Sequence, residues 1–264
     1  MKRPLLLLAV MMFALAAASA EAQTIKKPFN GTNLDGWKFN GGQENVWKVG
    51  MVQADAATLA LAPTPAGGGG AQQRPAGTGQ GASLPAGFQR LRQPALVNMV
   101  DADWGNANPR KGVDIYTEEK FGDCTVKLEF LITRGSNSGV YLMGEYEVQI
   151  ADSFAKPARS QLGQGDMGAI YSAAAPSRNA AGVPGTWQTF EIEFVAPKFD
   201  AAGNKTAKAL FKRIVLNGVL VQENVEVDGP TGGGITMKEA ATGPLMLQGN
   251  HGPVAFRNIE IIVP

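Results

Sequence analysis

The chain is organised around one stretch, Asn137-Ser138-Gly139-Val140-Tyr141-Leu142-Met143-Gly144-Glu145-Tyr146-Glu147-Val148-Gln149-Ile150-Ala151-Asp152-Ser153. Near its end three apolar residues alternate with Glu145, Glu147 and Gln149. A period of two indicates a β-strand with one apolar face, so two carboxylates and an amide point the same way. We interpret this polar row as the floor of a site. The alternative, a solvated strand face, would more often carry Lys, Thr or Ser.

Strand signals recur along the rest of the chain, with Gly, Pro and Asn turns between them. Asn217-Gly218 lies between two apolar runs, which is a strong β-hairpin signal. Helical periodicity is nearly absent, apart from a possible short turn at Thr117–Phe121. The sequence therefore predicts an all-β fold, a jelly-roll sandwich of two antiparallel sheets. The remaining expected strands are two short ones joined at Gly50 within 46–52, and single strands at 125–132, 190–194, 245–248 and 255–263.

The N-terminal residues have the pattern of a secretory signal peptide. Lys2 and Arg3 precede the apolar run Leu5–Ala18, and small residues follow. We expect a signal peptide over residues 1–22, cleaved after Ala20 or Ala22, and a periplasmic or secreted protein. The apolar run is shorter than the roughly 20 residues that span a bilayer, so no membrane span is predicted.

Residues 23–264 are predicted to form a single jelly-roll domain, because about 240 residues suit one large β domain. The composition changes at about 62–90, where glycine and proline replace apolar residues. Such a segment cannot bury enough apolar surface to offset the entropy of ordering it. We expect it to be a disordered insertion within the domain.

Charge and rare residues exclude several function classes. The chain has 24 Lys and Arg against 23 Asp and Glu, so no broad basic field favours nucleic acid, and a small or neutral partner is expected. Cys124 is the single cysteine and His251 the single histidine, which excludes an internal disulfide and disfavours an ordinary zinc site. Residues from Asp101 begin like a calcium loop, but Gly112 stands where the glutamate is needed. No cofactor or metal is predicted, although a divalent metal stays possible.

Two features could carry acid and base chemistry. Should Glu129 and Glu147 lie on neighbouring strands, about 5 Å would separate them across the strands. Like charges that close raise one pKa and yield an acid beside a base. Whether Glu129, Glu191 and Glu193 share the surface of Glu147 is left open by the sequence. His251 lies in a glycine-flanked loop after a predicted strand and titrates near neutral pH, so it could move a proton or be structural.

Ten motifs, spread over residues 29–259, occur in the order of a known family. The chain resembles the 3-keto-disaccharide hydrolase domain family, long known as a domain of unknown function. The resemblance implies a concanavalin A-like jelly roll and cleavage of glycosides already oxidised to a ketone at carbon 3. Among the motifs are Leu34-Asp35-Gly36-Trp37, Asn137-Ser138-Gly139-Val140-Tyr141-Leu142, Tyr146-Glu147-Val148-Gln149-Ile150, Trp187-Gln188-Thr189-Phe190, and His251-Gly252 followed by Phe256-Arg257-Asn258.

That substrate suits the residues. A ketone at carbon 3 acidifies the hydrogen on carbon 2, so a weak base can remove it; the group on carbon 1 then leaves, and water adds to the enone. For this route we expect Glu147 and His251 to be the base and the acid, in either assignment. We expect a set of polar substrate-binding residues: Gln149, Asn137, Glu129, Tyr171, Arg257 and Gln248.

Two other functions stay open from the sequence. A non-catalytic carbohydrate-binding module of the same fold would hold sugar on exposed Trp or Tyr rings. A retaining glucanase would need two carboxylates about 5.5 Å apart, and Glu145-x-Glu147 resembles such a pair.

Overall fold

The structure is a computed structural model that describes residues 23–41, 46–55, 57, 59–61, 93–98, 112–157 and 161–264. The described residues form strands, turns and loops without a helix, so they contain no helix that could cross a bilayer. The predicted signal peptide at 1–22, the insertion at 62–90 and the calcium-like loop from Asp101 lie outside the described residues.

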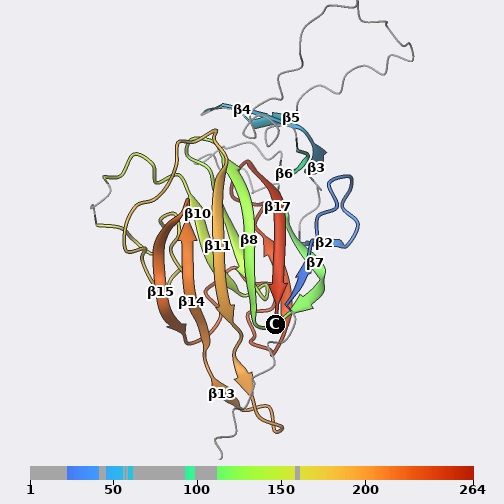
Figure 1. The fold of residues 1–264 in the computed structure, drawn as a ribbon, viewed down its shortest axis with the longest axis vertical. Coiled ribbons are helices and arrows are strands. Elements are labelled where there is room, and N and C mark those ends of the chain that lie inside the picture. The colour runs from blue at the N-terminus through green and yellow to red at the C-terminus, as the bar shows by residue number, and fades with distance from the viewer. Residues whose placement is uncertain are drawn as a thin grey trace, which may run out of the picture.

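Seventeen strands make two large antiparallel sheets and two small hairpins in the described part of the chain (Figure 1). Sheet A has the order β15-β14-β11-β8-β17-β6-β3, with β1 also paired to β17, and sheet B has the order β10-β9-β16-β7-β2. The sheet A strands are β1 (Thr24–Lys26), β3 (Trp47–Gly50), β6 (Ala95–Asn98), β8 (Cys124–Ile132), β11 (Gln188–Val195), β14 (Ala209–Leu216), β15 (Val219–Val227) and β17 (Val254–Val263). The sheet B strands are β2 (Trp37–Asn40), β7 (Asp114–Phe121), β9 (Asn137–Leu142), β10 (Tyr146–Ala151) and β16 (Gly243–Leu247). The hairpins are β4 (Val52–Ala54) with β5 (Leu59–Leu61), and β12 (Lys198–Phe199) with β13 (Lys205–Ala207).

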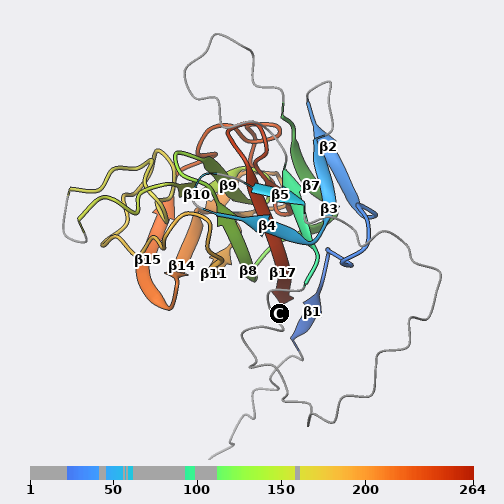
Figure 2. The same cartoon turned by 90° about the horizontal axis from the view of Figure 1, so that it is seen from above.

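The two sheets stack as layers, as Figure 2 shows from above, and the core lies between them. Alternation decides which side chains enter it. Phe130 of β8 stacks on Phe190 of β11 with ring centroids 4.9 Å apart, and Tyr146 of sheet B packs on Phe194 of sheet A at 5.4 Å. Burying one such ring contributes about 2 kcal/mol to folding. The all-β sandwich predicted from the sequence is therefore confirmed.

The predicted Asn217-Gly218 hairpin joins β14 to β15. Both turn residues have positive φ, 51° and 78°, as the tight turn between right-twisted strands requires. The predicted helical turn at Thr117–Phe121 is wrong, because these residues belong to strand β7. Trp37 of β2 pairs with Thr117 on one edge, and Gly243 of β16 pairs with Phe121 on the other. Hydrogen bonds to both neighbours favour the extended chain over a local turn.

Cys124, at the start of β8, is buried at the end of the core beside Phe121, Leu142 and Leu245. Burial, with the nearby Asp123 carboxylate, raises the pKa of its thiol to about 12. The thiol is therefore protonated and inert in the folded protein.

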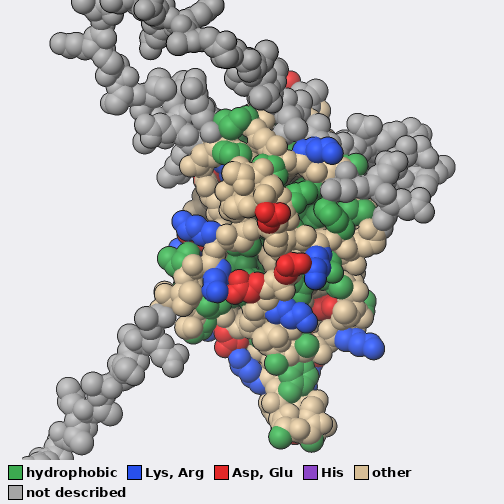
Figure 3. Space-filling view, turned by 90° about the vertical axis from the view of Figure 1, so that its right-hand side faces the viewer, with side chains coloured by type: hydrophobic (Ala, Val, Ile, Leu, Met, Phe, Trp, Pro, Cys, Tyr) green, Lys and Arg blue, Asp and Glu red, His purple; other side chains and the backbone are tan. Residues whose placement is uncertain are grey.

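Charges on the surface are mixed in sign. On the side shown in Figure 3, basic and acidic side chains are interspersed. Ion pairs join Lys26 to Glu119, Lys27 to Glu260 and Lys38 to Glu118. This distribution fits the near-zero net charge and gives that face no basic patch.

Candidate functional site

Polar side chains gather on the face of sheet B that points away from the core. The register places Glu147 of β10 opposite Tyr141 of β9, and Gln149 opposite Gly139. The backbone N–H of Gln248, directly after β16, donates to the Gly139 carbonyl at 3.0 Å. Residues opposite each other in a sheet point the same way, so these side chains form one group. They are buried: Tyr141, Glu147, Gln149 and Gln248 are 1%, 3%, 3% and 6% exposed.

Glu147 is the ionisable centre of this group. Burial raises the pKa of its carboxyl to about 8; a hydrogen bond donated by the Tyr141 hydroxyl opposes the shift, and the nearby Asp114 carboxylate adds to it. The carboxyl group lies over Gly139, where a Cβ atom would overlap Oε1 and stand 2.9 Å from Cδ. The glycine is therefore what makes room for Glu147.

Gln149 connects Glu147 to the start of β9. With its amide oriented so that both atoms are satisfied, Nε2 donates to Glu147 Oε1 at 2.9 Å and to the Ser138 carbonyl at 3.0 Å. Its Oε1 then accepts from Asn137 Nδ2 at 3.2 Å. The structure thus brings together Glu147, Gln149 and Asn137, three of the expected site residues.

Gln248 completes the row from the other side. Its Nε2 donates to the Tyr141 hydroxyl at 3.1 Å, which leaves the hydroxyl hydrogen for Glu147. Its Oε1 is buried without a hydrogen-bond partner among the described residues. A buried acceptor without a donor costs about 1 to 3 kcal/mol. A donor from a bound ligand would satisfy this oxygen.

His251 lies in a loop held at the same end of sheet B as Asn137. Asn98 Nδ2 donates to the carbonyls of Gly249 and Gly252 at 2.7 and 2.8 Å, and the Gly249 N–H donates to Asp114 at 2.8 Å. Gly252 packs against Ser136 and the backbone of Asn137. The half-buried His251 ring contacts the Asn250 side chain. The pairing of His251 with Glu147 as acid and base stays a prediction.

Tyr171 borders the site along the free edge of β10. Its N–H donates to the Glu147 carbonyl at 3.1 Å, and the Gln149 N–H donates to Ala169 at 2.9 Å. The Tyr171 ring lies beside Gly232 and is 38% exposed. Its ring is thus exposed beside the strand that carries Glu147.

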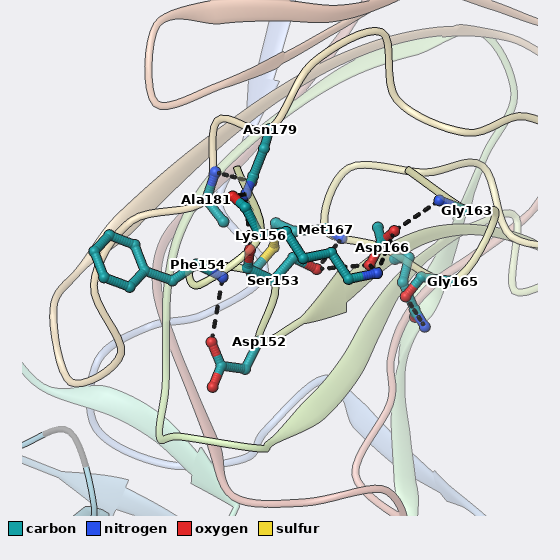
Figure 4. Close-up of polar contacts among 11 residues, drawn as sticks. Asp152, Ser153, Phe154, Lys156, Gly163, Gly165, Asp166, Met167, Asn179 and Ala181 are labelled. Carbon is teal, nitrogen blue, oxygen red and sulfur yellow. Dashed lines mark hydrogen bonds and ion pairs between the residues drawn. The ribbon is translucent and has the colours of Figure 1, made fainter. Parts of the chain in front are cut away.

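A polar cluster fixes the segment that carries Tyr171 (Figure 4). Asp166 accepts from Lys156 Nζ at 2.6 and 2.8 Å, from Ser153 Oγ at 3.1 Å and from the Gly163 N–H at 2.7 Å. Burial alone would raise the pKa of Asp166, but these donors outweigh it and hold the pKa below its usual value. The charged form is thus stable, and the cluster anchors the edge of the site.

Glu129 and Arg257 do not join this site. They lie on β8 and β17 of sheet A, where Arg257 Nε and Nη2 both donate to Glu129 Oε2 at 2.7 Å. The Trp187 ring stacks on the guanidinium at 3.9 Å. β8 pairs with β11 and β17 and not with β10, so Glu129 and Glu147 do not lie on neighbouring strands, which answers the question that the sequence left open. Glu191 and Glu193 lie on the same face as Glu129, in ion pairs with Lys127, Arg213 and Lys212.

Two residues of the site were missed by the sequence reasoning. Tyr141 could have been found, because Met143, Gly144 and Glu145 form a three-residue loop, with φ of 56° at Met143 and 69° at Gly144, and this loop length sets Tyr141 opposite Glu147. Methionine at positive φ is unusual, so Met143-Gly144 does not have the sequence pattern of a tight hairpin turn. Asp114 gives no local signal, since only the pairing of β7 with β16 brings it near the loop of His251.

The buried carboxyl group of Glu147 can transfer a proton away from bulk solvent. Glu147 is a carboxyl whose pKa lies near neutrality, so it can both take and give a proton at physiological pH. Among the described residues, no three His, Cys, Asp or Glu side chains gather into a set that could hold a metal ion. The donors around Glu147 are a hydroxyl and an amide, which suit a neutral ligand.

Comparison with known proteins identifies the family. A "putative glycosyl hydrolase" from Parabacteroides distasonis ATCC 8503 is 32% identical over 63% of this chain and 70% of its own, with a TM-score of 0.50. A second "putative glycosyl hydrolase" from the same organism, 17% identical, shares the fold over 90% of this chain and 92% of its own, with a TM-score of 0.51. A comparison with curated sequences gave no significant match. Residues 24–262 match the 3-keto-alpha-glucoside-1,2-lyase-like domain, and the chain belongs to that family.

Proposed function

We propose that this protein cleaves glycosides that carry a ketone at carbon 3, by proton abstraction, elimination and hydration. Family membership and the likeness to the 32% identical structure support a glycoside-acting enzyme in general. The observation that carries the finer proposal is Glu147, a buried carboxyl with a pKa of about 8 among neutral donors. Such a group is matched to a hydrogen that a neighbouring ketone has made weakly acidic.

The reaction balances through two proton transfers in the elimination and two in the hydration. Glu147 takes the proton from carbon 2, and the electron pair moves onto the ketone oxygen to form an enolate. The enolate re-forms the ketone as the bond from carbon 1 to the leaving oxygen breaks, and that oxygen receives a proton, for which we propose His251. Water then adds to carbon 1 of the enone and gives a proton back to His251, while the proton held by Glu147 returns to carbon 2. The sum is hydrolysis.

Neutral polar groups would bind the substrate. Gln248 Oε1 is a buried acceptor for a sugar hydroxyl, and Asn137 and Gln149 line the opposite end of the row. Donors near the ketone would stabilise the enolate oxygen, as in other reactions that develop negative charge in a water-poor site. Tyr171 would border the leaving group.

The retaining glucanase does not fit the contacts. That reaction needs a second carboxylate facing the same bond as Glu147. The Glu145 carboxylate instead accepts from the Thr236 N–H at 2.9 Å, from Thr236 Oγ1 at 2.6 Å and from the Met237 N–H at 2.9 Å. Because both of its oxygens accept hydrogen bonds from the protein, the Glu145 carboxylate does not face the bond that Glu147 would attack.

Turnover in heavy water tests the proposal. The purified protein is given methyl 3-keto-glucoside and its unoxidised parent, each with and without chelator. We expect release of methanol from the ketone alone, with one solvent deuterium at carbon 2 of the product. Cleavage of both substrates without deuterium would contradict the elimination route. Binding without turnover would favour the carbohydrate-binding module, and loss of turnover with chelator would assign a metal to the reaction.

We also propose export to the periplasm or the medium, from the sequence pattern of residues 1–22. The N-terminal residue of the protein recovered from culture tests it. Starts at Glu21 or Gln23 are expected, and a start at Met1 would contradict it.

A further inference from the structure

A glycine-rich segment, Thr231–Met237, lies directly over Tyr141 of the site and over Glu145, and we name it the strap. A Cβ atom at Gly233 would stand 2.7 Å from the Tyr141 hydroxyl oxygen, and one at Gly234 would overlap Glu145 Oε2. Gly233 also has a φ of 69°, which residues with a side chain adopt at a cost. A side chain at either position would therefore displace its neighbour or the strap.

Hydrogen bonds fasten the strap to the turn between β9 and β10. The Thr231 N–H donates to the Glu145 carbonyl at 3.0 Å, and the Ile235 N–H donates to the Gly144 carbonyl at 2.9 Å. Thr231 Oγ1 accepts from the Glu147 N–H at 2.8 Å. The strap thus touches the backbone of Glu147 as well as the hydroxyl that serves its carboxyl group.

Glu145 locks the other end of the strap. Its side chain is buried, and both its oxygens accept from Thr236 and Met237. Three donors to one carboxylate make a charge-assisted contact stronger than ordinary neutral ones. Glu145 was expected to line the site, and the contacts instead turn it toward the strap.

We propose that the strap, locked by Glu145, is a positioning device that holds the Tyr141 hydroxyl on Glu147. Gln248 donates to that hydroxyl from one side and Glu147 accepts from it on another, while Gly233 closes the space beside it. The hydroxyl is thus held by two hydrogen bonds, with the backbone of the strap packed beside it. In its catalytic part the inference rests on the proposed function, because Glu147 is the base there.

A double-mutant cycle tests the device. Gly233→Ala pushes a methyl group into the space of the Tyr141 hydroxyl, while Tyr141→Phe removes that hydroxyl; the next ring atom, Cζ, is 3.7 Å from the added carbon. We expect each single variant to lower kcat about tenfold to a hundredfold with KM little changed, and the double variant to be no slower than Tyr141→Phe. If Gly233→Ala lowers kcat as much in the Tyr141→Phe protein as in the wild type, the inference is overturned.

Two matched controls separate positioning from general strain. Gly203 has a left-handed φ of 83° with open space around it, and Gly229 precedes the strap with open space as well. Gly203→Ala should lower thermal stability as backbone strain does, and Gly229→Ala should change little. Both should keep the wild-type kcat. A loss of kcat in Gly203→Ala equal to that in Gly233→Ala would contradict the inference.

Titration of Glu147 tests the device without turnover. The carboxyl carbon shift, assigned by its loss in Glu147→Gln, gives the pKa. The charged and titratable groups around it are Asp114 on β7, Tyr141 on β9 and Tyr171 on the edge segment. Gly233→Ala and Tyr141→Phe should each raise the pKa, not additively, since both remove the donor to the carboxylate. An unchanged pKa in Gly233→Ala overturns the inference. A shifted pKa in a protein that cleaves no 3-keto-glycoside overturns the proposed function alone.

Discussion

The outer faces of the two sheets treat their glutamates in opposite ways. On sheet A, Glu129 is met by the Arg257 guanidinium at 2.7 Å and by Asn258 Nδ2 at 2.9 Å, and Trp187 covers the pair. On sheet B, Glu147 is equally a strand residue facing outward, but its described donors are a hydroxyl and an amide. A partner cation favours the ionised form, whereas burial among neutral groups favours the proton. The alternation of side chains along a strand places both glutamates on an outer face. Their partners then decide their roles: Glu129, paired with Arg257, is structural, and Glu147, among neutral donors, is the reactive carboxyl.

The same substitution on both faces should give the largest contrast. Glu147→Gln keeps the shape of the side chain and removes proton transfer, so kcat on a 3-keto-glycoside should fall about a thousandfold. Glu129→Gln should leave kcat within about twofold, because Glu129 lies on the other sheet. Steady-state kinetics on the two variants checks this. Equal losses of kcat in the two variants would contradict the assignment of Glu147 as reactive and Glu129 as structural.

Arg257 gives the next largest effect, on stability. Arg257→Met leaves the Glu129 carboxyl, whose side chain is 14% exposed, without its cation, and it removes the stacking on Trp187. We expect the free energy of unfolding to fall by about 3 kcal/mol, with kcat retained. Urea unfolding measures it. The double variant Arg257→Met with Glu129→Gln should regain part of the loss, and failure to do so would mean that packing on Trp187 dominates.

The pH dependence of the free energy of unfolding should further distinguish Glu147 on sheet B from Glu129 on sheet A. Burial raises the pKa of Glu147 from an ordinary 4.5 to about 8, so between these values the folded protein holds a proton that the unfolded chain has released. The stability linked to this proton is complete below pH 4.5 and is lost as pH rises to about 8. Glu147→Gln should therefore gain stability relative to the wild type across that window. Thermal unfolding at several pH values measures the difference, and a difference constant with pH would contradict the assignment.

Tyr171 should give the smallest effect. Its ring is 38% exposed beside the site, so Tyr171→Leu removes a contact made only on binding. We expect KM to rise severalfold with kcat retained. Phe154→Leu is the matched control, since that ring is 47% exposed and points away from the cluster in Figure 4. An equal change of KM in both variants would remove Tyr171 from the site.

Local pattern predicted the strands but not their partners. The alternation at 146–150 and the Asn217-Gly218 turn depend on nearest neighbours, and both are confirmed. Whether Glu129 or Tyr141 lies beside Glu147 depends on strand order, which contacts far apart in the sequence decide. The role of Glu145 as an anchor of the strap depends on Thr236, which is 91 residues further along the chain and gives no local signal. The sequence could thus nominate Glu147 and Gln149, whereas Arg257 needed the fold.

Cys124 gives the molecule a built-in reporter of opening at one end of the sandwich. Its protonated thiol is buried at the end of the core and is the chain's single cysteine, so an alkylating reagent reaches it only when that end of the sandwich opens. The rate of alkylation therefore counts these openings directly, with no dye or tag added. A variant that loses turnover while Cys124 stays as slow to alkylate as in the wild type has lost chemistry, and one that alkylates faster has lost stability.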